Sequence, residues 1–128
     1  MDGITIKLTP EKSLEYFFNS LCNSLGYFTS YGFEVDFNEE EYKKSKEKLT
    51  SPSYEEVFIQ MLKDGYGLTV NDIENDGEYT TTIYLKDVVE KVQKTPIRHL
   101  SNMINEEDDA DTGDVILQTV FFDEVVFG

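Results

Sequence analysis

Six carboxylic acids within residues 106–114 are the side chains whose types and spacing most clearly suggest chemistry. They are Glu106, Glu107, Asp108, Asp109, Asp111 and Asp114. Closely spaced carboxylates attract the Arg and Lys side chains of basic proteins, and they can replace the phosphates of a nucleic-acid strand. We therefore predict that these six residues form a partner-binding surface. A solvated loop between two helices is the alternative interpretation.

The charge of the whole chain points the same way. Its 128 residues contain 26 acids and 11 bases, which gives a net charge of −15, and no Lys or Arg follows Arg98. Such a charge repels nucleic acid and anionic membranes. We therefore expect a basic, nucleic-acid-binding protein as the partner, with no direct binding to nucleic acid or membrane.

A second acidic segment, residues 72–83, resembles the start of a calcium-binding loop. Acids occupy its first, third and fifth positions and Gly77 its sixth, but the twelfth position is Ile83 rather than the bidentate Glu of such loops. The Asp-Gly pair within Asn75-Asp76-Gly77 is instead typical of a hairpin turn. We expect a hairpin here, and neither a metal site nor a cofactor in the chain.

Cys22 and His99 are the remaining candidates for catalysis. Each is the only residue of its type, so the chain cannot form an internal disulfide or a cysteine-based zinc site. Cys22 lies on an apolar helical stripe, which predicts a core thiol, and His99 beside Arg98 is expected to be structural. Because no nucleophile–base pair or metal-ligand set appears, we expect no catalytic residue and no enzyme.

The first third of the chain shows clear local patterns. Ile4, Ile6 and Leu8 alternate as in a strand, and Thr9-Pro10 then forms a helix start. Apolar residues at spacings of three and four predict the buried stripe of this helix, and Gly26 is its expected end. The stripe consists of Leu14, Phe17, Phe18, Leu21, Cys22 and Leu25.

The remaining elements follow from alternation, capping residues and helical periodicity. We expect a strand at 32–37, a solvated helix at 39–49 capped by Asn38, and a helix that begins with a Ser53–Glu56 capping box and ends at Gly65. Its buried stripe should be Val57, Phe58, Met61 and Leu62. Strands at 68–73 and 78–85 form the hairpin, and the apolar residues from Val88 to Val92 are helical. Thr95 should cap a further helix containing Ile97, Leu100, Met103 and Ile104.

The last segment leaves two structures open. Asp111 and Asp114 could cap a helix through residues 115–122, but β-branched residues also permit a strand, best at 125–127. Together these elements predict one α+β domain spanning residues 1–128, with a small antiparallel sheet, including the 68–85 hairpin, packed with four to five helices. With no signal peptide or membrane span in the sequence, we expect a cytoplasmic protein.

Two C-terminal sequences, DTGDVILQ (111–118) and FDEVVFG (122–128), resemble those of small acidic proteins. The sequence DGEY (76–79) shows a weaker similarity to the same proteins. These proteins are encoded by phages and mobile elements of gut bacteria. The resemblance implies a mobile-element origin, where short acidic proteins often act against host nucleic-acid defences; it assigns no catalytic residue.

Together, charge and resemblance predict a non-enzymatic, acidic protein-binding inhibitor. It would mimic DNA or another nucleic acid and act on a host nuclease or a CRISPR-type effector, as an anti-CRISPR protein does. The alternative is a structural or assembly module whose acidic charge only maintains solubility.

Overall fold

Three short antiparallel strands, with helices packed around them, make up the computed structural model, which describes residues 6–127. The strands are β1 (Phe33–Asp36), β2 (Leu68–Asp72) and β3 (Thr81–Ile83). The helices are α1 (Pro10–Ser30), α2 (Glu39–Lys46), α3 (Tyr54–Lys63), α4 (Leu85–Lys91), the 3-10 helix η1 (Val92–Lys94), α5 (Ile97–Ile104) and α6 (Ala110–Phe122). The predicted α+β class is confirmed, with six α-helices among these residues instead of four to five.

The sheet has the order β1-β2-β3, so β2 is central and the 68–85 segment forms the expected hairpin. Phe33 lies opposite Asp72, and Leu68 lies opposite Ile83. Because side chains alternate between the two faces of a strand, one face is apolar and packs on the core. The other face carries polar residues, among them Glu34, Asp36, Thr69, Asn71 and Thr82.

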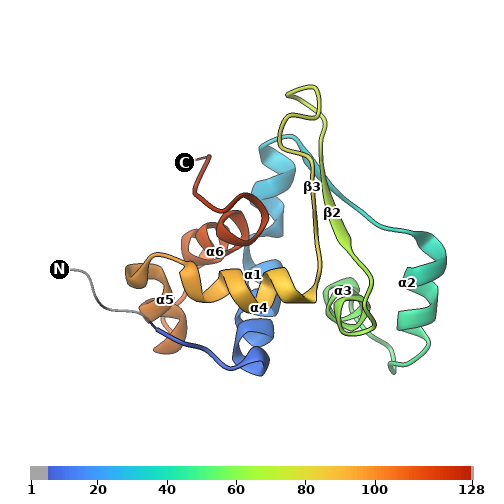
Figure 1. Cartoon of the computed structure of the whole chain (residues 1–128), viewed down its shortest axis with the longest axis horizontal. Helices are drawn as coiled ribbons and strands as arrows, with labels where there is room; N and C mark the ends of the chain where they lie inside the picture. The colour runs from blue at the N-terminus through green and yellow to red at the C-terminus, as the bar shows by residue number, and fades with distance from the viewer. Residues whose placement is uncertain (1–5, 128) are drawn as a thin grey trace.

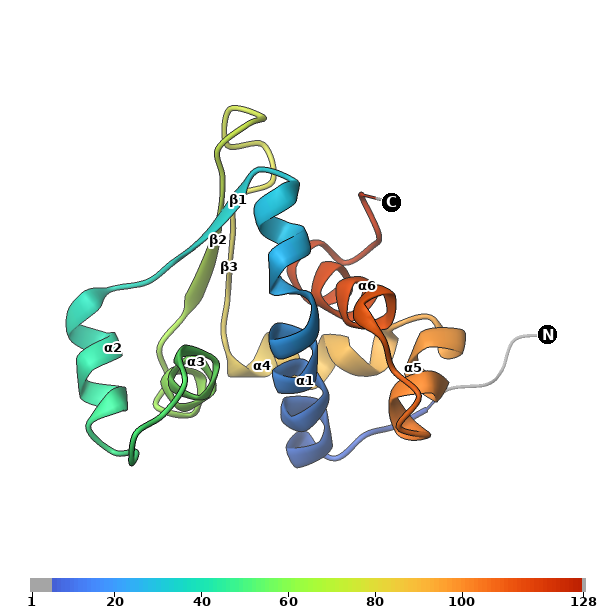
Figure 2. The same ribbon diagram turned by 180° about the vertical axis from the view of Figure 1, so that it is seen from behind.

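α1 and α6 cross on one side of the sheet, and α2 lies at the far edge of the molecule (Figures 1 and 2). The core between these layers forms one continuous cluster of buried apolar residues. Its largest fully buried members include Phe17, Phe28, Met61, Leu62 and Leu117.

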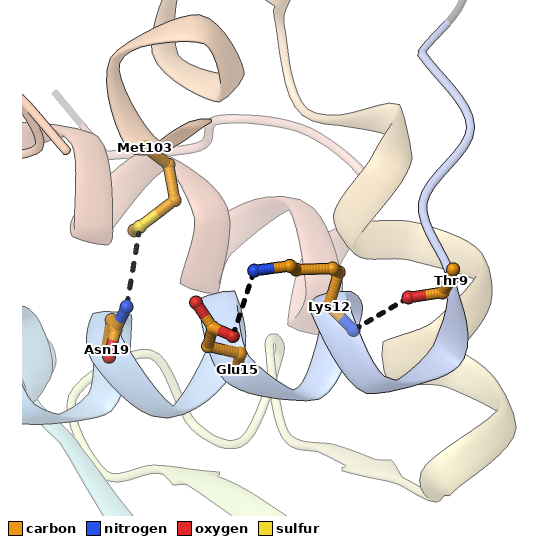
Figure 3. A network of polar contacts seen from close by, with 5 residues as sticks. All are labelled: Thr9, Lys12, Glu15, Asn19 and Met103. Carbon is orange, nitrogen blue, oxygen red and sulfur yellow. Dashed lines mark hydrogen bonds and ion pairs between the residues drawn. The ribbon is translucent and has the colours of Figure 1, made fainter. Parts of the chain in front are cut away.

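The start of α1 matches the sequence prediction (Figure 3). Thr9 Oγ1 accepts a hydrogen bond of 3.1 Å from the backbone N–H of Lys12, and Pro10 occupies the first turn. Lys12 Nζ lies 3.2 Å from Glu15 Oε1 on the surface. Further along the helix, Asn19 Nδ2 donates to Met103 Sδ at 3.8 Å, which joins α1 to α5.

The end and the buried face of α1 differ from the prediction. The helix continues past Gly26 because Phe28 is needed in the core, and it ends before Gly32, whose φ of 92° suits glycine. Phe17 and Leu21 are buried as expected, but Cys22 is exposed. The buried face instead includes three small residues: Ser20 and Ser24, which let α6 approach closely, and Ser13, which donates to the carbonyl of Val89 in α4.

Several predicted boundaries were correct because they depend on local hydrogen bonds. Asn38 caps α2 by accepting from Glu40 N and Glu41 N. The Ser53–Glu56 capping box is present, and Gly65, with φ of 90°, follows the end of α3. The predicted stripe of α3 is buried in full: Val57, Phe58, Met61 and Leu62.

Other boundaries were wrong because tertiary contacts set them. Residues 6–9 do not join the sheet; the N–H of Leu8 bonds to Gln93 Oε1 at 3.1 Å, while Ile4 lies outside the described residues. β3 ends at Ile83, because Asp87 Oδ2 accepts from Tyr84 N at 2.8 Å and starts α4 there.

Three further predictions need correction. α2 ends at Lys46 rather than at residue 49. Thr95 caps no helix: its hydroxyl is buried without a partner in residues 6–127, and α5 begins after Pro96. Residues 115–122 belong to a helix, and 125–127 form no strand.

Candidate functional site

The predicted acidic surface lies in the connection between α5 and α6 and in the first turns of α6. Glu106 adopts a left-handed φ of 58° at the end of α5, where the N–H of Glu107 bonds to the carbonyl of Asn102 at 2.7 Å. Both glutamates are exposed, as is Asp111. None of these three carboxylates accepts a hydrogen bond from another described side chain, so all three can meet a partner.

Asp108 and Asp109 are more constrained. Asn23 Nδ2 on α1 donates to Asp108 Oδ2 at 3.1 Å, which ties the connection to α1. Asp109 rather than Asp111 caps α6, because its Oδ1 accepts from the backbone N–H of Thr112 at 2.9 Å. That hydrogen bond lowers the pKa of Asp109, and the partial positive charge at the start of α6 acts in the same direction. Asp109 is therefore fixed and charged at neutral pH.

Asp114 does not belong to this surface. Only 8% of its surface is exposed, its Oδ2 accepts from Tyr31 Oη at 2.7 Å and Gln118 Nε2 at 3.1 Å, and its buried Oδ1 has no partner among the described residues. Burial raises the pKa of Asp114 above its usual value. Burial, followed by the bond to Asp114, also raises the pKa of Tyr31. The sixth predicted surface residue is thus a structural group.

Beside this network, the C-terminal tail folds back onto α6. Gln118 is completely buried, and its Oε1 accepts from the backbone N–H of Val126 at 2.7 Å. Phe127 stacks on Tyr31 with a centroid distance of 4.9 Å and also contacts Phe33 at 5.4 Å. These contacts fix the tail against the end of α1 (Figure 1).

The predicted hairpin turn contains further acids. Asp72 is buried and holds the turn, since its carboxylate accepts from Asn75 N at 2.9 Å and from Tyr79 N at 3.0 Å. Burial alone would raise the pKa of Asp72, but these backbone donors lower it below its usual value. The Glu74 side chain packs over Gly32, close to Tyr31. The turn thus places Glu74 beside the end of α1.

A hollow on the outer face of the sheet adds two more carboxylates. It has a volume of about 620 Å³, and none of its lining residues is basic. Asp36 and Glu41 line it together with the rings of Tyr66 and Tyr84. The sequence patterns did not reveal this hollow, because it lies between the sheet and the first turn of α2.

The two residues weighed for catalysis, His99 and Cys22, lie on different helices. His99 Nδ1 lies 3.3 Å from the hydroxyl of Thr112, and its Nε2 lies 3.1 Å from an Arg98 nitrogen, so it joins α5 to α6. Although Cys22 is exposed, loss of part of its hydration, followed by the charges of Glu55 and Glu56, raises the pKa of its thiol.

No protein-family model, curated protein or solved structure matches this chain. Within residues 6–127, no helix combines the length and the apolar character that crossing a membrane requires.

Proposed function

We propose that this protein is a non-enzymatic binding protein whose acidic surface occupies the basic, nucleic-acid-binding groove of a partner. The observation that carries this proposal is the placement of three segments without any Lys or Arg. Residues 13–38, 64–85 and 99–128 contain three, five and eight acids respectively and no Lys or Arg.

These three segments lie together in the fold. α1 packs on α6, β1 pairs with β2, and α6 also contacts β3. The hairpin loop, the end of α1 and the C-terminal tail occupy the upper part of Figure 1, whereas α2, which carries Lys43, Lys44 and Lys46, lies at the right edge. Acids therefore outnumber bases in this part of the molecule, where Lys91 pairs with Asp123, and this excess favours a basic partner.

The carboxylates of residues 106–111 form no ion pair with another residue of the described chain. The ion pairs found within residues 6–127 use Glu15, Asp64, Glu90 and Asp123. Because no carboxylate of residues 106–111 is among them, partner Arg and Lys side chains would not have to displace an internal base. The cost of binding is correspondingly small.

For the finer identity of the partner, we propose a host nuclease or a CRISPR-type effector. The resemblance of the C-terminal sequence to acidic proteins of phages and mobile elements supports this choice. The exposed carboxylates of the α5–α6 connection offer negative charges that can replace phosphates, whose usual protein ligands are Arg and Lys.

The test compares two triple variants that remove the same charge. Glu106→Gln, Glu107→Gln and Asp111→Asn change exposed acids of the proposed surface; Glu39→Gln, Glu40→Gln and Glu47→Gln change exposed acids of α2 and of the residue that follows it. We would measure association with purified nucleases and CRISPR effectors across a salt series, with duplex DNA as competitor.

The surface variant should associate about tenfold more slowly at low salt, and the α2 variant at nearly the wild-type rate. DNA should displace the protein, and the difference between variants should shrink as salt increases. Equal rates for both variants, or binding that DNA does not affect, would contradict the mimic and favour a module whose charge maintains solubility.

A further inference from the structure

β1 is an edge strand, and the register shows which of its backbone groups are free. Ile73 N donates to Gly32 O at 2.9 Å, so Gly32 and Ile73 form a hydrogen-bonded pair. Along an antiparallel ladder, hydrogen-bonded residue pairs alternate with pairs that share no hydrogen bond. The next hydrogen-bonded pairs are therefore Glu34 with Asn71 and Asp36 with Thr69. The N–H and C=O groups of the intervening residues, Phe33 and Val35, therefore point away from β2.

These backbone groups remain available for a further strand. No hydrogen bond between described residues reaches the N–H or C=O of Phe33 or Val35 on that side. The edge ends at Phe37, whose N–H is already bound by Asp36 Oδ1 at 2.9 Å. The free edge thus offers two donors and two acceptors, spaced as an added strand requires.

A groove runs along the same edge and is lined by residues of α1, β1 and α3. It has a volume of about 500 Å³. Its apolar lining consists of Leu25, Phe28, Phe33, Val35, Tyr54 and Phe58. Tyr54 is 52% exposed at the rim, so the groove presents both an apolar surface and an accessible entrance.

Side-chain alternation determines what kind of strand would fit. In the added strand, the residues opposite Phe33 and Val35 would face the apolar groove. The residues that alternate with them would lie beside the exposed carboxylates of Glu34 and Asp36. Opposite charges on neighbouring strands attract. We propose that β1 binds an extended segment of the basic partner in which apolar residues alternate with Lys or Arg; this proposal rests on the proposed function.

Charge argues against a second copy of this chain as the occupant. The two-fold antiparallel register that uses both Phe33 and Val35 places the two copies of Glu34 directly opposite each other. Like charges in that position destabilise strand pairing. The same carboxylates that prevent self-association select a basic strand.

The probe is an end-blocked peptide in which valine alternates with lysine, and its matched control has glutamate at each lysine position. Binding to the full chain is measured by calorimetry, and hydrogen exchange of the Phe33 and Val35 amides is followed by NMR. We expect the lysine peptide to bind and to slow the exchange of both amides, while the glutamate peptide does not bind.

Two variants test the backbone and the charge separately. Val35→Pro removes an N–H that faces away from β2 and leaves the ladder intact, and Val35→Ala keeps that N–H. Val35→Pro should weaken binding of the lysine peptide about five- to tenfold relative to Val35→Ala. Glu34→Lys, on an exposed position, should reverse the preference in favour of the glutamate peptide.

Binding to poly-lysine separates this inference from the proposed function. If poly-lysine binds but the amides of Phe33 and Val35 exchange as before, the edge-strand proposal is overturned and the acidic surface remains. If Val35→Pro and Val35→Ala bind the lysine peptide equally, the proposal is also overturned. Slowed exchange at both amides together with failure to bind any purified nuclease would support the edge site and contradict only the proposed function.

Discussion

The side-chain amide of Gln118, buried in α6, binds the backbone of Phe127 through both of its polar atoms. Nε2 donates to the Phe127 carbonyl at 2.8 Å, and Oε1 accepts from the Phe127 N–H at 2.8 Å. One side chain thereby replaces the neighbouring strand that an extended tail would otherwise need. The tail in turn covers Tyr31 and Phe33.

Replacing Gln118 with Leu should release the tail. The change removes the partners of two backbone N–H groups and one carbonyl, which we expect to cost about 1–3 kcal/mol of unfolding free energy. Urea denaturation measures the loss, and the amides of Val126 and Phe127 should exchange faster. Val125→Ala, at an exposed position of the same tail, is the control and should leave both quantities unchanged.

Asp114 should make the stability of the protein depend on pH. Burial raises its pKa in the folded state above the usual value of 3.8. The folded protein therefore holds this proton to a higher pH than the unfolded chain does. The stability that the proton contributes is fully present below the pKa of the unfolded chain and is lost as pH rises through the pKa of the folded state.

The matching variant is Asp114→Asn, which cannot ionise but can still accept from Tyr31. The unfolding free energy of the wild type relative to this variant should fall as pH rises from about 4 towards neutrality. Urea denaturation at several pH values measures this difference. A constant difference across that range would show that Asp114 titrates as an ordinary surface acid.

Gly113 permits the close packing of α6 on α1. A Cβ at this position would lie 2.2 Å from Ser24 Oγ and 3.3 Å from the backbone of Ser20. Gly113→Ala should therefore destabilise the protein by about 1–3 kcal/mol. Ser24→Ala removes the nearest atom, and we expect the double variant to lose less than the sum of the two single losses. Strictly additive thermal or urea data would argue against this contact.

The core stripe of α1 offers a comparison between adjacent rings. Phe17 is fully buried and lies 6.2 Å from the ring of Phe121, whereas Phe18 is only half-buried. Phe17→Ala should cost about 3–5 kcal/mol. Phe18→Ala should cost clearly less, and similar thermal midpoints for the two variants would contradict the burial of Phe17.

Hydrogen bonds between near neighbours in sequence were predicted well. The caps at Thr9, Asn38 and Ser53 each involve residues at most three positions away, so residue type and spacing specify them. The alternation around Phe33 and Val35 likewise predicted β1. The acidic composition is also a property of sequence alone, as is the absence of bases after Arg98.

The tertiary structure decided which members of each pattern have which role. Asp111 and Asp114 look equivalent in the sequence, but Asp114 is buried because the Tyr31 hydroxyl, from 83 positions away, meets it. Cys22 lies on the apolar stripe, yet the close approach of α6 selects Ser20 and Ser24 for the interface.

The free edge of β1 likewise follows from strand order, which alternation within one strand cannot specify. Local capping and pleating depend on a few neighbouring residues, whereas burial and strand order depend on contacts between distant segments. For that reason the sequence determines the charge of this protein and most of its capped helix starts, and packing alone determines which acids are exposed.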